Sequence, residues 1–286
     1  MMEWLDDALR LAGRLIVLAL FSLLGFFVAG MLLKPLFPRG VPAGPDGVLL
    51  LGFVGAFALV VGHLAVVLIF ERAQWTTTGL DERSWRPRSL LLGAVLGLTV
   101  VAVPTGLLFA TGQLRFETAA SGSWAAAALD ALIWLAVSAL FEELMARGYA
   151  LGAIVRQWGV VAGVAITSVG FGLLHLGNPG ATAWSVVAVI IAGVFLAGVR
   201  LTTGSLAAAW LAHVGINWAQ GALLHAPISG LTFLPTPGYR LVPSGPDWLT
   251  GGAWGLEAGA ATAATLLVIT FLLFYARPAM STHRDR

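Results

Sequence analysis

Most of this chain consists of apolar runs that are long enough to cross the hydrocarbon core of a membrane. A membrane-spanning α-helix needs about 20 such residues. Eight runs meet this requirement, at 11–33, 48–70, 89–111, 124–146, 159–176, 182–200, 205–225 and 252–276. Backbone polar groups find no water inside a bilayer, so runs of this kind fold as helices. The sequence therefore predicts an all-α, polytopic membrane protein with about eight transmembrane helices.

Composition supports this prediction and leaves no soluble domain. With 58% hydrophobic and 10% charged residues, the chain lacks the polar side chains needed to cover a soluble protein of 286 residues. We expect one integral membrane domain over 1–286, located in the cell membrane. The chain has no cysteine, which excludes disulfides and Cys-ligated zinc. Its net charge of +2 is too small to suggest nucleic acid as a partner.

The basic residues predict how the helices are oriented, because cytoplasmic loops carry an excess of Lys and Arg. With eight spans, one side of the membrane holds most of them: Arg10, Arg14, Arg72, Arg83, Arg86, Arg88, Arg147, Arg156, Arg200, Arg277, Arg284 and Arg286. The other side holds Lys34, Arg39, Arg115 and Arg240. We therefore expect both termini to be cytoplasmic. The longest irregular stretch, 226–251, is expected to shape or cover an external opening.

Three charged residues lie inside the fourth apolar run. Glu142 and Glu143 are adjacent, and Arg147 follows four residues after Glu143. Ionisable groups at membrane depth are costly unless they are paired or face a wet cavity, so they indicate a functional site. Residues four apart face each other on a helix, which predicts an ion pair between Glu143 and Arg147. Glu142 then remains free to act as a general base.

The next apolar run carries Phe171 and His175 on one helical face, together with Ser168. If two unbroken helices meet in a turn near Gly159, antiparallel packing brings Glu142 and His175 to the same height. A later run carries His213 and Asn217, which are one turn apart. Both residue types can donate hydrogen bonds to the anionic intermediate of acyl transfer. Together these pairs are typical of a peptide hydrolase, with Glu and His activating water.

In these three motifs the chain resembles the CPBP intramembrane proteases, which include the type II CAAX prenyl endopeptidases. The family pattern Glu-Glu-x-x-x-Arg corresponds to Glu142, Glu143 and Arg147, Phe-x-x-x-His to Phe171 and His175, and His-x-x-x-Asn to His213 and Asn217. The resemblance covers roughly 135–220. It indicates a catalytic core at about 124–225, in helices four to seven, with flanking helices at 11–111 and 252–276.

The resemblance implies a role for each of these residues. Glu142 and His175 would activate water, His213 and Asn217 would stabilise the oxyanion, and Glu143, Arg147 and Phe171 would support the site. We favour a metal-free mechanism, because the sequence lacks a His-Glu-x-x-His signature. The alternative is a metalloprotease, with Zn²⁺ held by Glu142, His175 and His213.

The expected partners are the lipid bilayer and a peptide or membrane-protein substrate, such as a prenylated CAAX-type tail or another peptide. We expect cleavage near the cytoplasmic side. The competing function is a non-catalytic membrane protein, either a proton-coupled transporter or an immunity or scaffold protein with the same fold. In a transporter, Glu142 and the histidines would act as a proton relay. The structural alternative for Glu142, Glu143 and Arg147 is a buried ion-pair network that locks helix packing. Other intramembrane polar residues are interpreted as structural or interfacial: His63, Asp130, His225 and Glu257.

Overall fold

A computed structural model describes residues 2–38, 40–42, 45–232 and 234–275 of the chain. Arg39, Arg277, Arg284 and Arg286 of the orientation count, and the last residue of the expected run 252–276, lie outside the described residues. The longer helices are α1 (Met2–Leu33), α2 (Pro45–Phe70), α3 (Pro87–Ala110), α4 (Trp124–Arg147), α5 (Tyr149–Leu174), α6 (Ala183–Thr203), α7 (Leu206–Trp218) and α9 (Ala260–Tyr275). The all-α, polytopic prediction is confirmed.

Several of these helices are long and apolar enough to cross a membrane. Within the described residues they form five stretches, at 5–33, 49–70, 87–110, 124–177 and 183–203, and the fourth contains both α4 and α5. Helix α7 is shorter and continues as one π-helical turn, η3 (Ala219–Leu223). Helix α9 is apolar but has only 16 residues. Each of the eight expected runs thus contains a helix, although the boundaries differ.

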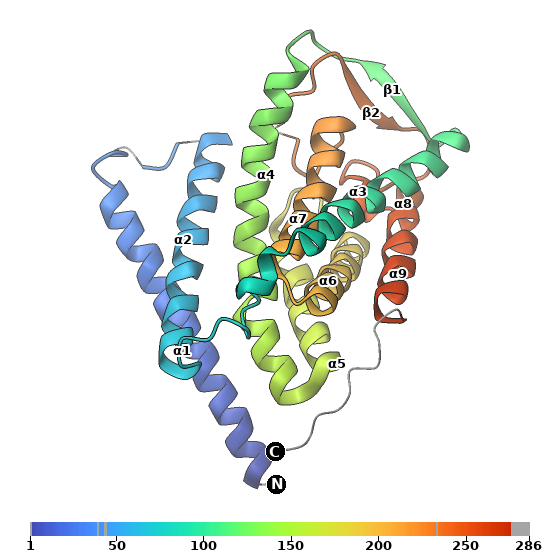
Figure 1. Cartoon of the computed structure of the whole chain (residues 1–286). Coiled ribbons are helices and arrows are strands. Elements are labelled where there is room, and N and C mark those ends of the chain that lie inside the picture. Colours follow the sequence, from blue (N-terminus) through green and yellow to red (C-terminus); the bar gives the residue numbers. More distant parts are fainter. Residues whose placement is uncertain (1, 39, 43–44, 233, 276–286) are drawn as a thin grey trace.

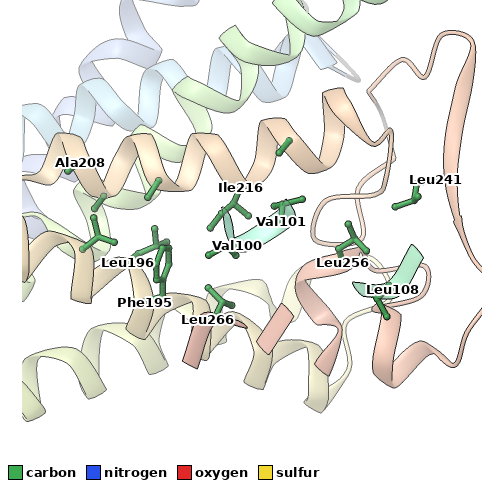
Figure 2. Packing of buried hydrophobic residues seen from close by; sticks show 14 of the residues in the cluster. Val100, Val101, Leu108, Phe195, Leu196, Ala208, Ile216, Leu241, Leu256 and Leu266 are labelled. Atoms are coloured by element: carbon green, nitrogen blue, oxygen red, sulfur yellow. The ribbon is translucent and has the colours of Figure 1, made fainter. Parts of the chain in front are cut away.

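The helices form two groups on either side of α4 (Figure 1). Helices α1 and α2 pack against each other as an antiparallel pair on one side of α4. Helices α3, α6, α7 and α9 share the largest buried apolar cluster on the other side. Figure 2 shows this cluster, with Phe195 and Leu196 of α6, Ile216 of α7 and Leu266 of α9. Helix α4 therefore contacts both groups, which places its charged end between them.

The sequence predicted one turn, near Gly159, between the fourth and fifth helices, but the structure has two breaks. Helix α4 ends at Arg147, because Gly148 departs from helical geometry (φ −73°, ψ −133°). Helix α5 starts directly afterwards and bends sharply at Gly159, whose φ of 85° is readily accessible to glycine. The expectation that helix four continues unbroken to Gly159 is therefore wrong. The reversal at Gly159 is correct, and it returns the chain toward α4.

The expected helix 252–276 is wrong at its start. Residues 252–259 form turns and the short 3₁₀ helix η4 (Leu256–Ala258), and α9 begins only at Ala260. Three glycines in this region, Gly251, Gly252 and Gly255, have positive φ. A two-stranded sheet was also not expected. Strand β1 (Leu114–Thr118) pairs antiparallel with β2 (Tyr239–Pro243), and the short helix α8 (Asp247–Thr250) follows.

Candidate active site

The three charged residues of α4 take separate positions in its last two turns. Arg147 donates from Nη1 to Oε1 of Glu143 at 3.0 Å, and both side chains are completely buried. Arg147 also donates to the backbone oxygen of Gly193 in α6 at 3.2 Å. A Cβ at Gly193 would approach Arg147 Nη2 to 3.2 Å, so this close approach suits glycine. The predicted ion pair is thus present, and it ties α4 to α6.

His213 is connected to this pair through Glu143. Its Nδ1 lies 2.9 Å from the same Oε1 of Glu143 that Arg147 contacts. An ionised carboxylate can only accept hydrogen bonds, so Nδ1 of His213 carries the proton. The Nε2 atom of His213 then points toward Glu142, whose Oε2 is 3.9 Å away. Glu143 therefore positions His213 and Arg147 together.

His175 approaches Glu142 from the end of α5. Its Nδ1 lies 2.8 Å from the backbone oxygen of Phe171, one turn earlier. A carbonyl oxygen is only an acceptor, which again puts the proton on Nδ1 and leaves Nε2 as the reactive nitrogen. That Nε2 is 3.9 Å from Oε2 of Glu142. The sequence prediction that Glu142 and His175 lie at the same height is therefore correct despite the break at Gly148.

The Oε2 atom of Glu142 is the centre of the cluster. It is 3.9 Å from Nε2 of both histidines and, among the described residues, has no hydrogen-bond partner. Its other oxygen, Oε1, accepts a long hydrogen bond of 3.4 Å from Ser138, one turn before it. Ser138 was not among the residues predicted for the site. The 3.9 Å separations are too long for direct hydrogen bonds but suit one water about 2.8 Å from each atom.

Phe171 links the second motif to the other two. Its ring lies 4.1 Å from the guanidinium carbon of Arg147, a cation–π contact. It also packs edge-on against the rings of His175 and His213, at 4.8 Å and 6.0 Å between centroids. The aromatic ring therefore fixes the spacing between the two histidines.

These residues line one cavity of about 350 Å³. Glu142, His175, His213 and Asn217 all contribute to its wall, together with apolar side chains such as Phe141 and Leu135. Asn217 lies one turn beyond His213 on α7, as the motif predicted. A largely apolar cavity with a few convergent polar groups is the usual form of a catalytic or binding site.

One wall of this cavity is formed by Ile228, Ser229, Leu231 and Leu234. We call the segments 228–232 and 234 the roof loop. Its tip is a tight turn in which Ile228 and Leu231 exchange backbone hydrogen bonds and Ser229 and Gly230 both have positive φ. This geometry is that of a type I′ turn, which rarely has serine at its first central position. The loop belongs to the stretch 226–251 that was expected to shape or cover an opening.

The roof loop is held by residues that sequence reasoning did not select. Asn178 donates to the backbone oxygen of Ser229 at 3.1 Å. Glu257 accepts hydrogen bonds from the backbone and hydroxyl of Ser229 and from Gln220. Glu257 was interpreted as structural or interfacial because it has no partner at helical spacing. Its partners instead come from distant loops, a relationship that helical periodicity does not reveal.

A second cavity of about 510 Å³ lies between α1, α2 and α4. It is lined by apolar residues of α1 and α2, and it shares Ser138, Phe141 and Glu142 with the first cavity. The ring of Phe141 packs over Gly55, where a Cβ would approach it to 2.7 Å. The two cavities therefore meet at Phe141 and Glu142.

The remaining polar residues do not line the catalytic cavity. Ser168, which shares a helical face with Phe171 and His175, is fully buried against Gly193 and does not line the cavity. His63 lies 2.7 Å from the backbone oxygen of Leu59 through Nδ1 and accepts from the backbone N–H of Tyr149 at 3.0 Å through Nε2. His225 stacks on Tyr239, and Asp130 is exposed.

The alternative zinc site has suitable donors but unsuitable spacing. Ligand atoms around a tetrahedral zinc with bonds of about 2.0–2.1 Å lie about 3.3–3.5 Å apart. Glu142 Oε2 is 3.9 Å from each histidine nitrogen. Within the described part of the chain, no group of three or more His, Cys, Asp or Glu side chains is arranged to hold a metal ion. The residues do not fit the metal in this arrangement.

The fold and the cavity define a polytopic membrane protein with a buried Glu, His and Asn site. Comparison with protein families agrees with this class. Residues 122–219 match the family described as "Rce1-like: Type II CAAX prenyl endopeptidase Rce1-like". The match contains α4 to α7 and all three motifs. Searches of curated proteins and of solved structures each give no match.

This match over residues 122–219 confirms the resemblance to the CAAX proteases inferred from the motifs. The match supports, in general terms, a CAAX-type intramembrane protease. A membrane-embedded protease of this kind is surrounded by a lipid bilayer and takes a peptide as its substrate. Helices α1 to α3 and α9 lie outside the matched region.

Proposed function

We propose that this protein is a glutamate-based intramembrane endopeptidase in which Glu142 is the general base. The observation that carries the proposal is the position of Oε2 of Glu142. This atom is 3.9 Å from Nε2 of both His175 and His213 and has no hydrogen-bond partner among the described residues, and the Glu142 side chain lines a cavity of about 350 Å³. A water held between Glu142 and His175 would be oriented for attack on a peptide carbonyl.

In the first step Glu142 takes a proton from this water as the water oxygen bonds to the carbonyl carbon. The carbonyl oxygen becomes an oxyanion, which His213 and Asn217 would stabilise as donors. When the C–N bond breaks, Glu142 returns the proton to the leaving nitrogen. The products are a carboxylic acid and an amine, so the proposed reaction needs only water and the peptide.

His213 can donate from Nε2 only when its ring carries two protons, because Nδ1–H is directed at Glu143. Glu143 then has a part in catalysis as a positioning residue, since it fixes which His213 nitrogen faces the cavity. Arg147 holds Glu143 in turn, and Phe171 separates the two histidines. We propose no metal in this reaction, since the spacing of Glu142, His175 and His213 is too wide for zinc.

The test is cleavage of a fluorogenic CAAX-type peptide, farnesylated and unmodified, by purified protein in nanodiscs. Glu142→Gln keeps the shape of the side chain and removes the base, so we expect cleavage to be lost while folding is retained. The matched control is Glu82→Gln, which changes an exposed glutamate in the α2–α3 connection. Loss of activity with excess chelator, restored by zinc, would refute the metal-free mechanism.

A further inference from the structure

The connection between α2 and α3 lies at a boundary of the membrane. Residues 71–86 join two helical stretches, 49–70 and 87–110, that are each long and apolar enough to cross a bilayer. The 3₁₀ helix η1 (Glu82–Trp85) forms the last part of this connection, and Arg86 alone separates it from the first residue of α3. Side chains of η1 that point away from the protein therefore lie at the depth of the lipid headgroups.

Two exposed arginines of this region have no partner. Arg83 and Arg86 are both exposed, and the backbone N–H of Arg86 donates to the backbone oxygen of Arg83 at 3.3 Å. Residues three apart in a 3₁₀ turn lie on the same side of the turn. Among the described residues, neither arginine side chain forms a hydrogen bond or an ion pair. Trp85 lies between them in the sequence and is 57% exposed. We call Arg83, Trp85 and Arg86 the η1 surface.

Basic residues outnumber acidic residues around this surface. Residues 72–88 contain two acids, Asp81 and Glu82, and four arginines, Arg72, Arg83, Arg86 and Arg88. All four arginines are exposed, and none forms an ion pair with another described residue. The exposed arginines of the sheet differ in this respect, because Arg115 and Arg240 both pair with Glu117. The η1 surface is therefore positively charged, and its charge is available to a ligand.

A further arginine lies beneath the connection. Arg200 of α6 is 6% exposed, its Nη2 donates to the backbone oxygen of Thr77 at 3.4 Å, and its Nε has no hydrogen-bond partner among the described residues. Its guanidinium group lies directly under Gly79, where an added Cβ would overlap it. Asp81 attracts Arg200 without forming an ion pair with it. Because salt screens a buried charge only weakly, Arg200 adds to the positive potential above it.

The backbone of the connection is fixed against the start of α7. Ser84 is completely buried on the side of η1 that faces the protein. Its backbone oxygen accepts from the hydroxyl of Ser205 at 2.6 Å, and its hydroxyl accepts from the backbone N–H of Ala207 at 3.2 Å. The backbone oxygen of Gly79 accepts from the N–H of Leu206 at 2.9 Å. A ligand of the η1 surface therefore meets a preformed backbone, which lowers the entropic cost of binding.

We infer that the η1 surface binds the phosphate groups of anionic phospholipids in the surrounding bilayer. Guanidinium groups bind phosphate oxygens through two parallel hydrogen bonds, and indole rings favour the interface between hydrocarbon and water. A lipid fits the position of η1, because η1 borders two membrane-spanning stretches and does not line the catalytic cavity. The inference concerns lipid binding alone, so it does not depend on the proposed protease activity.

Contact with labelled lipids tests the inference directly. The chain has no cysteine, so Trp85→Cys can carry a single fluorophore while both arginines are unchanged. The labelled protein is placed in phosphatidylcholine nanodiscs that contain a small fraction of spin-labelled phosphatidylglycerol or of spin-labelled phosphatidylcholine, and the quenching is compared. Each arginine near an anionic lipid surface provides about a fivefold preference, so we expect phosphatidylglycerol to be preferred by up to about 25-fold.

Variants of the same labelled protein separate charge from other effects. Arg83→Gln/Arg86→Gln should lower the preference at least about fivefold, whereas Arg83→Lys/Arg86→Lys should keep most of it. A fluorophore on Ser121→Cys, an exposed position between β1 and α4, should show little preference. Raising the ionic strength from 0.1 M to 1 M shortens the Debye length from about 10 Å to about 3 Å and should weaken the preference of the unaltered arginines.

Equal quenching by the two lipids at the Trp85→Cys label overturns the inference, and so does a preference that Arg83→Gln/Arg86→Gln leaves unchanged. Thermal unfolding in pure phosphatidylcholine nanodiscs verifies that this variant folds. If it does not fold, the dependence on ionic strength decides, because that measurement keeps both arginines, and a preference that salt does not weaken overturns the inference.

Inorganic phosphate distinguishes a lipid from a soluble anion. We expect phosphatidylglycerol in the nanodisc to raise the midpoint of thermal unfolding, and inorganic phosphate added to phosphatidylcholine nanodiscs to leave it unchanged. If phosphate raises the midpoint as much as phosphatidylglycerol does, and Arg83→Gln/Arg86→Gln removes both effects, the surface binds a soluble anion and the inference is overturned.

Discussion

Arg147 gives the sharpest test of how the site is held together. We predict that Arg147→Met destabilises the protein by about 3–5 kcal/mol, the usual cost of removing one partner from a buried ion pair. The cost is large because Glu143 is 0% exposed and would be left as an uncompensated charge. The variant also loses the bond to Gly193 and the contact with Phe171. We expect the lower part of the range, because His213 still contacts Oε1 of Glu143.

The double variant Glu143→Gln/Arg147→Met separates the ion pair from the other contacts. With both charges removed, no buried charge remains unpaired, so the double variant should be more stable than Arg147→Met alone by about 2 kcal/mol. Stability is measured by unfolding in mixed micelles of increasing SDS content, followed by far-UV circular dichroism. Arg88→Met changes an exposed arginine and serves as the matched control, with an expected effect within about 0.5 kcal/mol.

Two results would refute this reasoning. A loss below about 1 kcal/mol for Arg147→Met would mean that Glu143 is solvated or neutral in the native protein. A double variant that is less stable than Arg147→Met would mean that Glu143 stabilises the protein mainly through His213. Cleavage is measured for each variant in parallel, and Glu143→Gln should lower kcat more than it raises KM, because Glu143 orients His213 but does not line the cavity.

Three further predictions concern the surroundings of the site. Hydrogen bonding by Arg156 lowers the pKa of Glu71 from 4.5 to about 2. The ionised form of Glu71 therefore stabilises the fold above about pH 4.5, and this contribution is lost as the pH falls toward 2. Because Arg156 is about half exposed, the loss should be only about 1–2 kcal/mol, and Glu71→Gln should remove this pH dependence in the same unfolding assay. Glu257→Gln should raise KM for peptide cleavage more than it lowers kcat, because it loosens Ser229 in the roof loop while the catalytic residues keep their contacts; an unchanged KM would contradict this role. Gly55→Leu should push the ring of Phe141 toward Glu142, where the two cavities meet. Cleavage of lipid-anchored peptides should then slow more than cleavage of short soluble peptides. Equal slowing of both would argue against a connection between the two cavities.

The core of the site could be predicted because it depends on helical spacing. Glu143 and Arg147 are four residues apart and form the expected pair. Glu142 and His175 are about equally far along the chain from Gly159, which predicted that they lie at the same height. They do so despite the break at Gly148. Local periodicity survives such a break because each motif lies within one or two turns of its own helix.

The contacts between helices could not be predicted in the same way. Neither the bond from Arg147 to Gly193 nor that from His213 to Glu143 follows from spacing along the chain, because each joins separate helices. The roof loop is a stronger example. Asn178 and Glu257 both hold Ser229 at the cavity wall, and the three residues come from separate parts of the chain: Asn178 follows η2, Ser229 lies between η3 and β2, and Glu257 lies in η4. Hydropathy places helices in the membrane but carries no information on how their connecting loops fold back.

The two acidic residues of the first motif illustrate how similar side chains acquire different roles from their surroundings. Glu143 is completely buried and contacts two nitrogen donors, Arg147 and His213, so its charge is neutralised by permanent partners. The Glu142 side chain is 22% exposed and lines the cavity, and its Oε2 has no hydrogen-bond partner among the described residues. We therefore propose that Glu142, rather than Glu143, exchanges a proton with the attacking water. Adjacent residues on a helix point about 100° apart. Glu143 therefore points toward its buried partners, whereas Glu142 points toward the cavity.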